Sequence, residues 1–404
     1  MISVEEARRR VLAAFTALPA ETVALSSALG RVLAADVAAR ITQPWAAVSA
    51  MDGYAVRAED VADPPVTLTR IGAVPAGASH DGVVGRGECV RIFTGAPLPD
   101  GTDTIVIQED ASADGGRVTV REGAARGAYV RPAGLDFAAG DVLLTAGRTL
   151  TARDIGLAAA MNVPWLRVHR RPRVAILATG DEIVMPGDPV GPNQIVSSNG
   201  LALSALVEAE GGLPLNLGIA LDERESLTAM AAGAVGADLL LTTGGASVGE
   251  HDLIRDVLGD QGLELEFWKI AMRPGKPLMF GRIGPTPLLG LPGNPVSSMV
   301  CGLLFARPIL RALQGVAEPE PPTATASLGR DLPRNDRRQD YLRSRLERDS
   351  AGRPTATPFD LQDSSMMSRL AHADCLVVRP PQAPPARKGD TVEIVTFAAG
   401  LVGF

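Results

Sequence analysis

The stretch from about Val168 to Gln314 alternates between strand-like and helix-like segments, and this rhythm constrains the fold more than any other feature. Val174–Thr179 forms a continuous apolar run, as expected for a strand buried on both faces of a parallel sheet. Repeated strand–helix alternation predicts an α/β layer with a mostly parallel sheet. The other expected elements are strands over 215–220, 238–243 and 287–291 and helices over 200–210, 223–235, 252–259 and 295–313.

The segments on either side of this layer follow a β pattern. Short stretches with alternating apolar and polar residues, punctuated by Gly, Pro and Asp, predict strands. One such group between 52 and 122 predicts a β-rich module, with strands over 66–71, 88–93, 103–109 and 117–121. A second group follows the Pro/Glu linker at 318–322 and predicts a small β-barrel, with strands over 339–346, 375–378 and 391–395.

Charge and cysteine content exclude several classes of protein. With 39 basic and 46 acidic residues the net charge is −7, so binding to nucleic acid is not expected. The only cysteines, Cys89, Cys301 and Cys375, offer no disulfide framework or CxxC pair, which favours a reducing, cytoplasmic compartment. No apolar run reaches the roughly 18 residues that a membrane span needs, so no membrane association is expected.

A glycine-rich segment, Thr242–Asp252, leads from a predicted strand into a predicted helix. Its sequence, Thr-Thr-Gly-Gly-Ala-Ser-Val-Gly-Glu-His-Asp, lets the backbone approach a ligand closely. Free amides at a helix N-terminus favour phosphate. The segment matches neither the Walker A nor the GxGxxG pattern, so an ordinary glycine-rich turn is the alternative interpretation.

The segment Leu291–Pro295 defines another strand-to-helix junction. Asn294 is a favourable N-cap, and Pro295 suits the first helical position. Ligands of open α/β sheets bind at the edge where such junctions lie. A well-capped helix without a ligand is the alternative.

Positive charge is concentrated between Phe267 and Pro277. The chain has three lysines, and Lys269 and Lys276 both lie in this segment, on either side of Arg273. The other 36 cationic residues are arginines, so two compact ammonium groups in one loop suggest an anion site. Chance, or a solvated loop, is the alternative.

Acidic residues follow the predicted strands. Asp181 and Glu182 come after one strand, Asp222 after another and Asp252 closes the glycine-rich segment. Carboxylates at this edge of a parallel sheet can hold Mg²⁺ together with substrate phosphates. Each acid alone could instead be solvated or cap a helix. The four histidines show no metal-binding spacing.

Five motifs occur in the order expected for one family: Ser-Ala-Met-Asp-Gly-Tyr-Ala (49–55), Thr-Gly-Asp-Glu (179–182), Gly-Gly-Ala-Ser-Val-Gly-Glu-His-Asp (244–252), Pro-Gly-Lys-Pro (274–277) and Leu-Pro-Gly-Asn-Pro-Val-Ser (291–297). On these motifs nearly the whole chain resembles the molybdopterin molybdenumtransferase family, the MoeA-like proteins that include the gephyrin E domain. The resemblance implies Mg²⁺-dependent insertion of molybdate into adenylated molybdopterin, with release of AMP.

The resemblance also implies an architecture. We expect an elongated homodimer with four domains per chain: a discontinuous linking domain (1–46 and 124–167), the inserted β-rich module (47–123), a MoaB/MogA-like molybdopterin-binding α/β domain (168–316) and a C-terminal β-barrel (317–404). The site would lie between subunits, so that Asp52 and Thr94 act across the dimer. A molybdopterin adenylyltransferase, and molybdoenzymes or cofactor-maturation proteins, are the further partners implied.

Carrying the family motifs over residue by residue gives a candidate site. The implied metal ligands are Glu182, Asp222 and Asp252. The implied catalytic residues are Asp52, Thr94, Asp222, Asp252, Lys269, Arg273 and Lys276. The implied pterin and phosphate contacts are Gly244, Gly245, Ser247, Gly249, Pro292, Asn294, Pro295, Arg131, Asp136 and Ser368.

Three departures from the family pattern bear on detail. Arg273 stands where lysine is common, which replaces a point charge with a planar fork. Pro44–Val48 lacks the usual acid or amide residues, and Leu135 replaces a frequent acid before Asp136. A non-catalytic pterin-binding scaffold and a tungstate-inserting relative are the two alternative functions.

Overall fold

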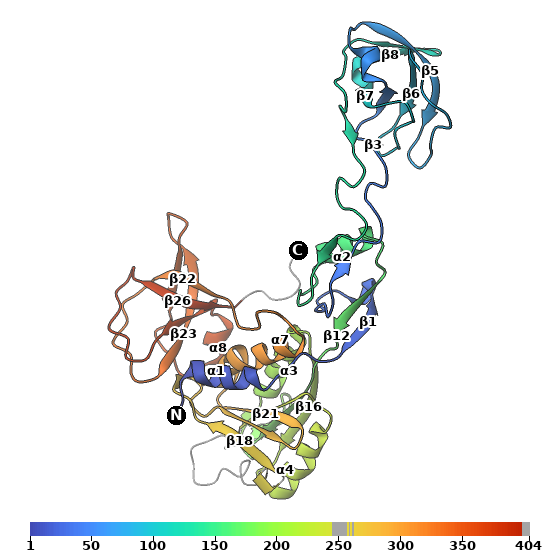
Figure 1. Cartoon of the computed structure of the whole chain (residues 1–404). Coiled ribbons are helices and arrows are strands. Elements are labelled where there is room, and N and C mark those ends of the chain that lie inside the picture. Colours follow the sequence, from blue (N-terminus) through green and yellow to red (C-terminus); the bar gives the residue numbers. More distant parts are fainter. Residues whose placement is uncertain (245–256, 258, 261, 398–404) are drawn as a thin grey trace. The chain divides into compact units, whose positions relative to one another are not determined.

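The computed structural model describes residues 1–244, 257, 259–260 and 262–397, and its chain divides into two compact units (Figure 1). Unit 1 contains residues 1–35, 146–153 and the chain from 167 onward. Unit 2 contains residues 36–145 and 154–166. This division is coarser than the four domains expected, so those domain boundaries stay a prediction.

Unit 1 is built on a six-stranded sheet in the order β16-β13-β17-β21-β20-β18. The first four strands are parallel, and β20 and β18 extend the sheet in antiparallel pairings. The predicted α/β layer is therefore confirmed. The strands are β13 (Arg173–Thr179), β16 (Leu213–Ala220), β17 (Leu239–Thr243), β18 (Leu263–Trp268), β20 (Met279–Ile283) and β21 (Thr286–Leu291).

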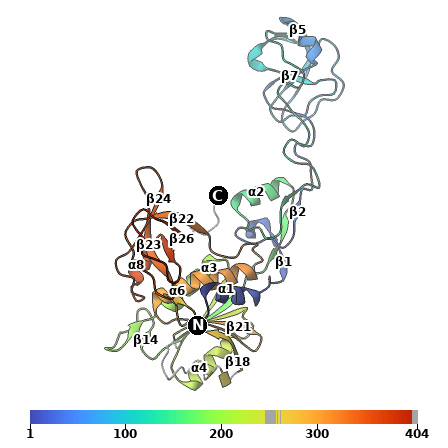
Figure 2. The same cartoon turned by 60° about the vertical axis from the view of Figure 1, so that its left-hand side comes forward.

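Helices pack on both faces of this sheet (Figure 2). Alternate side chains of β13 point to opposite faces, so Val174 and Ile176 join one core cluster and Ala175 and Leu177 another. The first cluster also takes in residues of α1 (Val4–Ala13), α3 (Asn199–Ala209), α6 (Pro295–Cys301) and α7 (Arg307–Leu313), and the second takes in α4 (Arg224–Ala231).

The predicted helix over 295–313 is present as one helical run, in which the π-helical turn η5 (Gly302–Ala306) joins α6 to α7. Of the described helices, this run alone is long and apolar enough to cross a bilayer. However, 78% of its apolar window is buried inside the protein, as in a core helix.

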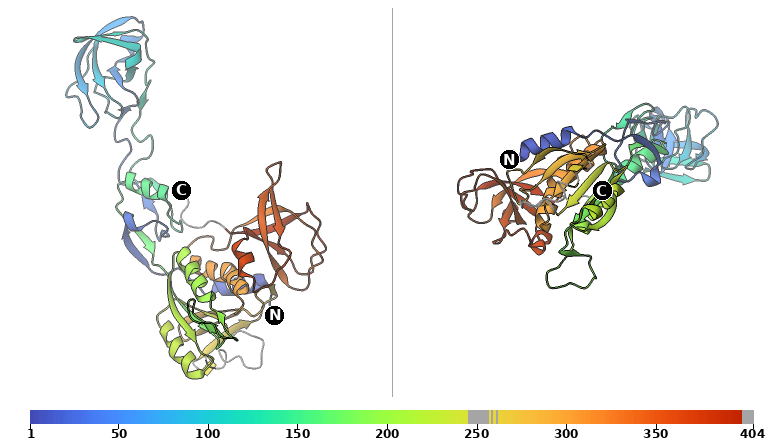
Figure 3. Two further views of the ribbon diagram at one scale, coloured as in Figure 1. Left: turned by 180° about the vertical axis from the view of Figure 1, so that it is seen from behind. Right: turned by 90° about the horizontal axis from the view of Figure 1, so that it is seen from below.

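The C-terminal strands of unit 1 close into a five-stranded barrel in the order β23-β24-β22-β26-β25, which confirms the barrel prediction (Figure 3). Pairing of β25 with β23 closes the ring, and β19 (Met272–Arg273) adds to β23 in parallel. The barrel strands are β22 (Thr323–Leu328), β23 (Gln339–Arg348), β24 (Pro354–Pro358), β25 (Cys375–Arg379) and β26 (Thr391–Thr396).

Unit 2 contains a six-stranded mixed sheet in the order β7-β4-β6-β5-β9-β8, so this region is β-rich as predicted. Strand β4 is not among the strands predicted from the sequence, although all four of its residues are buried and it pairs with both β6 and β7. The strands are β4 (Gly53–Val56), β5 (Val66–Val74), β6 (Glu88–Ile92), β7 (Thr104–Ile107), β8 (Ala111–Asp114) and β9 (Arg117–Val120).

Shorter elements complete the two units. The first helix is α1, where Glu6 N donates to the Ser3 hydroxyl at 3.1 Å, so that Ser3 caps the helix. The remaining elements are β1 (Ala20–Ala24), β2 (Val37–Ala38), β3 (Val48–Ser49), β10 (Val130–Arg131), β11 (Val142–Leu144), α2 (Ala152–Ala160), β12 (Trp165–His169), β14 (Ile183–Val184), β15 (Ile195–Val196), α8 (Met367–Ala371) and the 3₁₀ turns η1 (Leu25–Ser27), η2 (Ala58–Val61), η3 (Gln108–Asp110) and η4 (Ala232–Ala234).

Candidate active site

The sheet of unit 1 brings most of its predicted site residues to one edge. Because β13, β16, β17 and β21 are parallel, the residues that follow them emerge together. Two successive antiparallel pairings make β18 run in the same direction as β21, so Lys269 also emerges at this edge. Strand spacing places β16 and β18 roughly 24 Å apart, which suits an extended ligand.

Three carboxylates lie together where β13 and β16 end. Asp222 N donates to Asp181 Oδ1 at 2.9 Å, which joins the two loops. Burial raises the pKa of Asp222 above its ordinary value, and the negative charges of Asp181 and Glu182 raise it further. The predicted proximity of Glu182 and Asp222 is therefore present. Asp181 is a third member of this acid group.

These oxygens suit Mg²⁺ chemically, since hard cations prefer carboxylate ligands. Among the residues that the structure describes, no group of three His, Cys, Asp or Glu side chains has an arrangement that could hold a metal ion. The acid group therefore supplies only part of a coordination shell. Asp252, the third predicted ligand, lies outside the described residues, as do Gly245, Ser247 and Gly249.

Gly244 begins the predicted phosphate cradle in a conformation that favours glycine. Its φ is +97°, and a methyl group on its Cα would collide with the carbonyl oxygen of Thr179. The Thr179 hydroxyl beside it is buried, at 2% exposure, and has no hydrogen-bond partner within the described part of the chain. The end of β13 thus presents a buried polar group to the start of the glycine-rich segment.

Asn199, at the start of α3, ties the ends of β17 and β21 together. Its Nδ2 donates to Thr243 Oγ1 at 2.8 Å and to the Gly293 carbonyl at 2.7 Å. The Thr243 hydroxyl donates in turn to the Pro292 carbonyl at 3.3 Å. The backbone of the Pro292–Asn294 turn is therefore held in place by buried hydrogen bonds.

The junction at α6 differs in one respect from its prediction. Pro295 is the first helical residue, as expected, and Asn294 occupies the N-cap position. The Asn294 side chain makes no capping bond, because its Nδ2 donates instead to Ser364 Oγ at 3.0 Å. The Ser364 carbonyl accepts from Val296 N at 3.1 Å. A loop of the barrel domain thus satisfies the helix terminus, and Ser368 follows in α8, which packs against α6.

The loop between β18 and β20 carries both predicted lysines. Lys269 has φ +68° and holds its ammonium 3.5 Å from the centre of the Trp268 ring, a cation–π contact. Its amide donates to the Leu278 carbonyl, and Ile270 N donates to the Lys276 carbonyl. No carboxylate within the described ranges forms an ion pair with either lysine.

Arg273 has a different environment from the lysines. Its Nε donates to Asp340 Oδ1 at 2.8 Å, its Nη2 pairs with Asp340 Oδ2, and Asp336 lies 3.4 Å from Nη1. The hydrogen bond to Asp340 raises the pKa of Arg273. The guanidinium therefore joins the loop to the barrel, and its predicted catalytic role stays a prediction.

In unit 2, Asp52 and Thr94 are in direct contact. Asp52 Oδ1 accepts hydrogen bonds from Thr94 N and Oγ1, each at 2.8 Å. These bonds, with a smaller effect of the Arg91 charge, hold the pKa of Asp52 below its ordinary value. Arg91 is itself fixed over the Tyr54 and Phe93 rings. The two predicted residues thus form one rigid polar group.

Arg131 and Asp136 line a cavity of about 810 Å³ in unit 2. Residues from four segments of the chain form its walls. Besides Arg131 and Asp136 they are Gln43, Pro44, Trp45, Val48, Gly77, Ala78, Ser79, Gly95, Pro97 and Leu135. Because Gly95 follows Thr94, the cavity adjoins the Asp52–Thr94 group.

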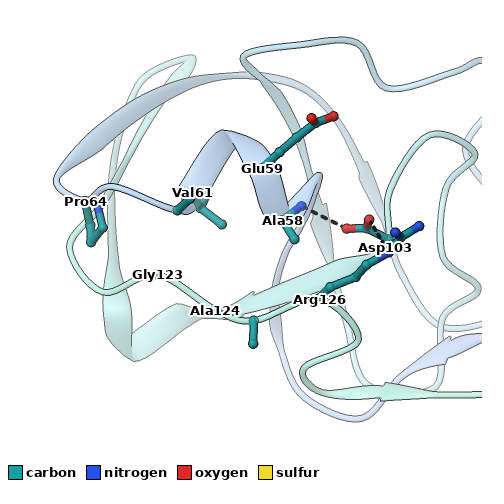
Figure 4. Close-up of a pocket in the computed structure, with 10 residues that line it drawn as sticks. Ala58, Glu59, Val61, Pro64, Asp103, Gly123, Ala124 and Arg126 are labelled. Atoms are coloured by element: carbon teal, nitrogen blue, oxygen red, sulfur yellow. Dashed lines mark hydrogen bonds and ion pairs between the residues drawn. The ribbon is translucent and has the colours of Figure 1, made fainter.

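A second cavity of unit 2, of similar volume, lies beside η2 (Figure 4). Its main charged groups are Asp103 and Arg126, which pair at 3.1 Å, while Asp103 also accepts from Ala58 N at 2.8 Å. These charges satisfy one another, and we assign this cavity no function.

Sequence reasoning missed several residues of the site. Asp181 was noted as an acid after a strand, but not as a ligand. Asn199, Ser364 and Asp340 act through contacts between residues more than 40 positions apart, which no local pattern shows. Only the topology of the sheet and barrel brings them into place.

Comparison with protein families accounts for nearly the whole chain. Residues 2–162 match the MoeA N-terminal region (domain I and II), residues 175–312 a probable molybdopterin binding domain, and residues 325–397 the MoeA C-terminal region (domain IV). A solved structure, the molybdopterin biosynthesis moea protein from Pyrococcus horikosii, superposes with a TM-score of 0.85 at 32% identity and covers 99% of this chain and 100% of its own.

Curated relatives agree with these matches. Molybdopterin molybdenumtransferase 2 of Mycobacterium tuberculosis is 36% identical over 98% of this chain and 99% of its own length. The molybdopterin molybdenumtransferase of Haemophilus influenzae is 33% identical with the same coverage. That of a Nostoc species is 41% identical over 74% of this chain and 70% of its own. The chain therefore belongs to the molybdopterin molybdenumtransferase family, which gives it a transferase role in molybdenum cofactor biosynthesis.

Proposed function

We propose that this chain inserts molybdate into adenylated molybdopterin in a Mg²⁺-dependent reaction that releases AMP. The observation that carries the proposal is the shared sheet edge, where the acid group of Asp181, Glu182 and Asp222 and the ammonium groups of Lys269 and Lys276 emerge from one layer. The substrates are anions and the protein has a net charge of −7, so local cations must hold them.

The acid group would hold Mg²⁺ through Glu182 and Asp222, with Asp252 as the further ligand implied by the resemblance. When bound, the cation supplies charge stabilisation to the phosphoanhydride of the adenylated pterin. Lys269 and Lys276 would hold molybdate beside the dithiolene. The backbone around Gly244 and the Pro292–Asn294 turn would approach the pterin and its phosphate closely.

The atoms of the proposed reaction balance without a redox partner. Two dithiolene sulfurs form bonds to molybdenum, and two molybdate oxygens leave as two hydroxide ions, each taking up one thiol proton. Water attacks the phosphoanhydride, so AMP leaves and the pterin keeps its own phosphate. Such chemistry depends on placement and charge rather than on a side-chain nucleophile.

We also propose a cytoplasmic homodimer in which the Asp52–Thr94 group of one chain completes the site of the other. A molybdopterin adenylyltransferase would deliver the substrate, and molybdoenzymes or cofactor-maturation proteins would receive the product. The family membership and the separate polar groups of the two units support this arrangement.

The test is release of AMP from adenylated molybdopterin by the purified chain. We expect release that requires both molybdate and Mg²⁺, and little when either is omitted. Binding of the adenylated pterin without AMP release under all conditions would instead support the non-catalytic scaffold. Tungstate in place of molybdate tests the third possibility in the same assay.

A further inference from the structure

We propose that Trp45 is a stacking platform for a fused heteroaromatic ring, with Arg131 of the same cavity holding the attached phosphate. The inference rests on the proposed function, because the adenine and pterin rings of adenylated molybdopterin are the fused rings that this cavity would receive. It adds a specificity-determining residue that the family motifs do not include.

The first observation is the exposure of Trp45. Its side chain is 72% exposed and lines the 810 Å³ cavity, a volume within the range of ligand pockets. A tryptophan buries far more apolar surface than any smaller side chain, so leaving one in water forgoes a large stabilisation. A ring stacked on the indole would recover that stabilisation.

The second observation is that the backbone under Trp45 is fixed on both sides. Gly134 N donates to the Pro44 carbonyl at 2.9 Å, and Leu98 N donates to the Ala47 carbonyl at 2.9 Å. The adjacent Val48 pairs with Arg131 in the β3–β10 ladder. The backbone that carries the exposed indole is therefore held by hydrogen bonds to two other segments that line the cavity.

The third observation is the charge beside the ring. Within residues 36–145, all of which the structure describes, the Arg131 guanidinium makes no hydrogen bond or ion pair, and neither does the Asp136 carboxylate. An unpaired guanidinium binds phosphate oxygens in a bidentate manner. The Trp45 ring and the Arg131 guanidinium, which line the same cavity, together suit a heterocycle that carries a phosphate group.

Calorimetric titration of the full chain tests the proposal with three probes: AMP, 6-hydroxymethylpterin and inorganic phosphate. AMP carries ring and phosphate, hydroxymethylpterin carries the ring alone, and phosphate carries no ring. We expect Trp45→Ala to weaken binding of at least one ring-bearing probe about tenfold, since stacking on an aromatic side chain has this order of effect. Binding of inorganic phosphate should change less than twofold.

Three variants serve as controls. Trp165→Ala removes another exposed tryptophan, outside the cavity, and should leave all three affinities unchanged. Trp45→Phe keeps an aromatic face and should retain most of the affinity. Arg131→Ala should weaken AMP and phosphate but not hydroxymethylpterin.

The proposal is overturned if the ring-bearing probes bind Trp45→Ala as they bind the unmodified chain, or if neither binds the unmodified chain. It is also overturned if Trp45→Ala changes only the sedimentation of the protein, since Trp45 would then contact a second copy. Ring binding that depends on Trp45 in a chain that releases no AMP would leave this inference standing and reject the proposed reaction.

Discussion

Arg273 Nε donates to Asp340 Oδ1 at 2.8 Å, which pairs a half-exposed guanidinium with a carboxylate whose side chain is only 5% exposed. Burial raises the pKa of Asp340, and the bond to Arg273 works in the opposite direction. Without Arg273 the carboxylate would be buried and largely unpaired. The pair joins β19 to β23, so it connects the cationic loop to the barrel.

The first prediction concerns the stability that this pair confers. Arg273→Ala should lower the free energy of unfolding by about 1–3 kcal/mol, which is less than the loss of a fully buried pair because the guanidinium is half exposed. Arg273→Lys keeps the charge but loses the bidentate contact with Asp340, so it should lower the free energy of unfolding by a smaller amount. Urea unfolding measures both. Unchanged stability in Arg273→Ala, together with lost AMP release, would assign the guanidinium to the substrate instead.

The second prediction separates Lys269 from Arg273. Lys269→Gln should reduce molybdate-dependent AMP release about 100-fold, because a charge aimed at the reacting oxyanion is removed from a site with few others. Its unfolding free energy should fall by less than about 1 kcal/mol, since the substitution removes the cation–π contact with Trp268 but no ion pair with a described carboxylate. The matched control is Lys388→Gln in the barrel. A stability loss equal to that of Arg273→Ala would contradict the prediction.

The third prediction is a pH dependence in unit 2. The pKa of Asp52 is lowered chiefly by Thr94 N and then by its hydroxyl. The carboxylate therefore stabilises the fold above its ordinary pKa of 3.8, and this contribution is lost as the pH falls from 3.8 through the lower folded value. An NMR titration of the Asp52 carboxyl carbon should show a midpoint below 3.8.

Thr94 variants sharpen that titration. Thr94→Val should raise the Asp52 midpoint only part of the way toward 3.8, because the larger contribution, that of the backbone N–H, remains. Thr94→Ser keeps the hydroxyl and should leave the midpoint unchanged. A midpoint at the ordinary value in the unmodified protein would mean that the two hydrogen bonds do not persist in solution.

The fourth prediction compares Gly244 of the candidate cradle with Gly293 of the neighbouring Pro292–Asn294 turn. Gly244→Ala should destabilise the chain by about 2 kcal/mol, because φ is +97° and the new methyl group meets the Thr179 carbonyl. Gly293→Ala is the control, since its methyl group would lie 3.5 Å from Gly244 Cα, an ordinary contact. Equal effects of the two substitutions on chemical unfolding would contradict the geometry at Gly244.

Sequence alone predicted the elements whose pattern is local. The apolar runs of β13 and β17 and the helix that begins at Pro295 lie where their periodicity places them. The acids were found because they follow strands, and strands of one direction end at one edge. The lysines were found because two of the three in the chain lie between Phe267 and Pro277. The residue types and the direction of the chain were sufficient for this.

Features that depend on distant contacts could not be predicted in this way. Strand β18 was not predicted, although Leu263–Glu266 alternates leucine with glutamate, because the strands of this layer were expected as continuous apolar runs, whereas β18 lies at an edge of the sheet. Asn294 was predicted to cap its own helix with its side chain, but that side chain donates instead to Ser364 of the barrel region. Arg273 was grouped with the lysines because the sequence does not show that its guanidinium pairs with Asp340, which comes 67 residues later.

The acid group gives the most direct test of the account. Asp222→Ala should reduce AMP release from adenylated molybdopterin by about 100-fold or more, since a ligand that positions the cation is lost. The amount of pterin bound to the variant should remain near that of the unmodified chain, because the glycine turn and the lysines are intact. Equal loss of AMP release and of pterin binding in a folded Asp222→Ala protein would contradict the metal role and the mechanism built on it.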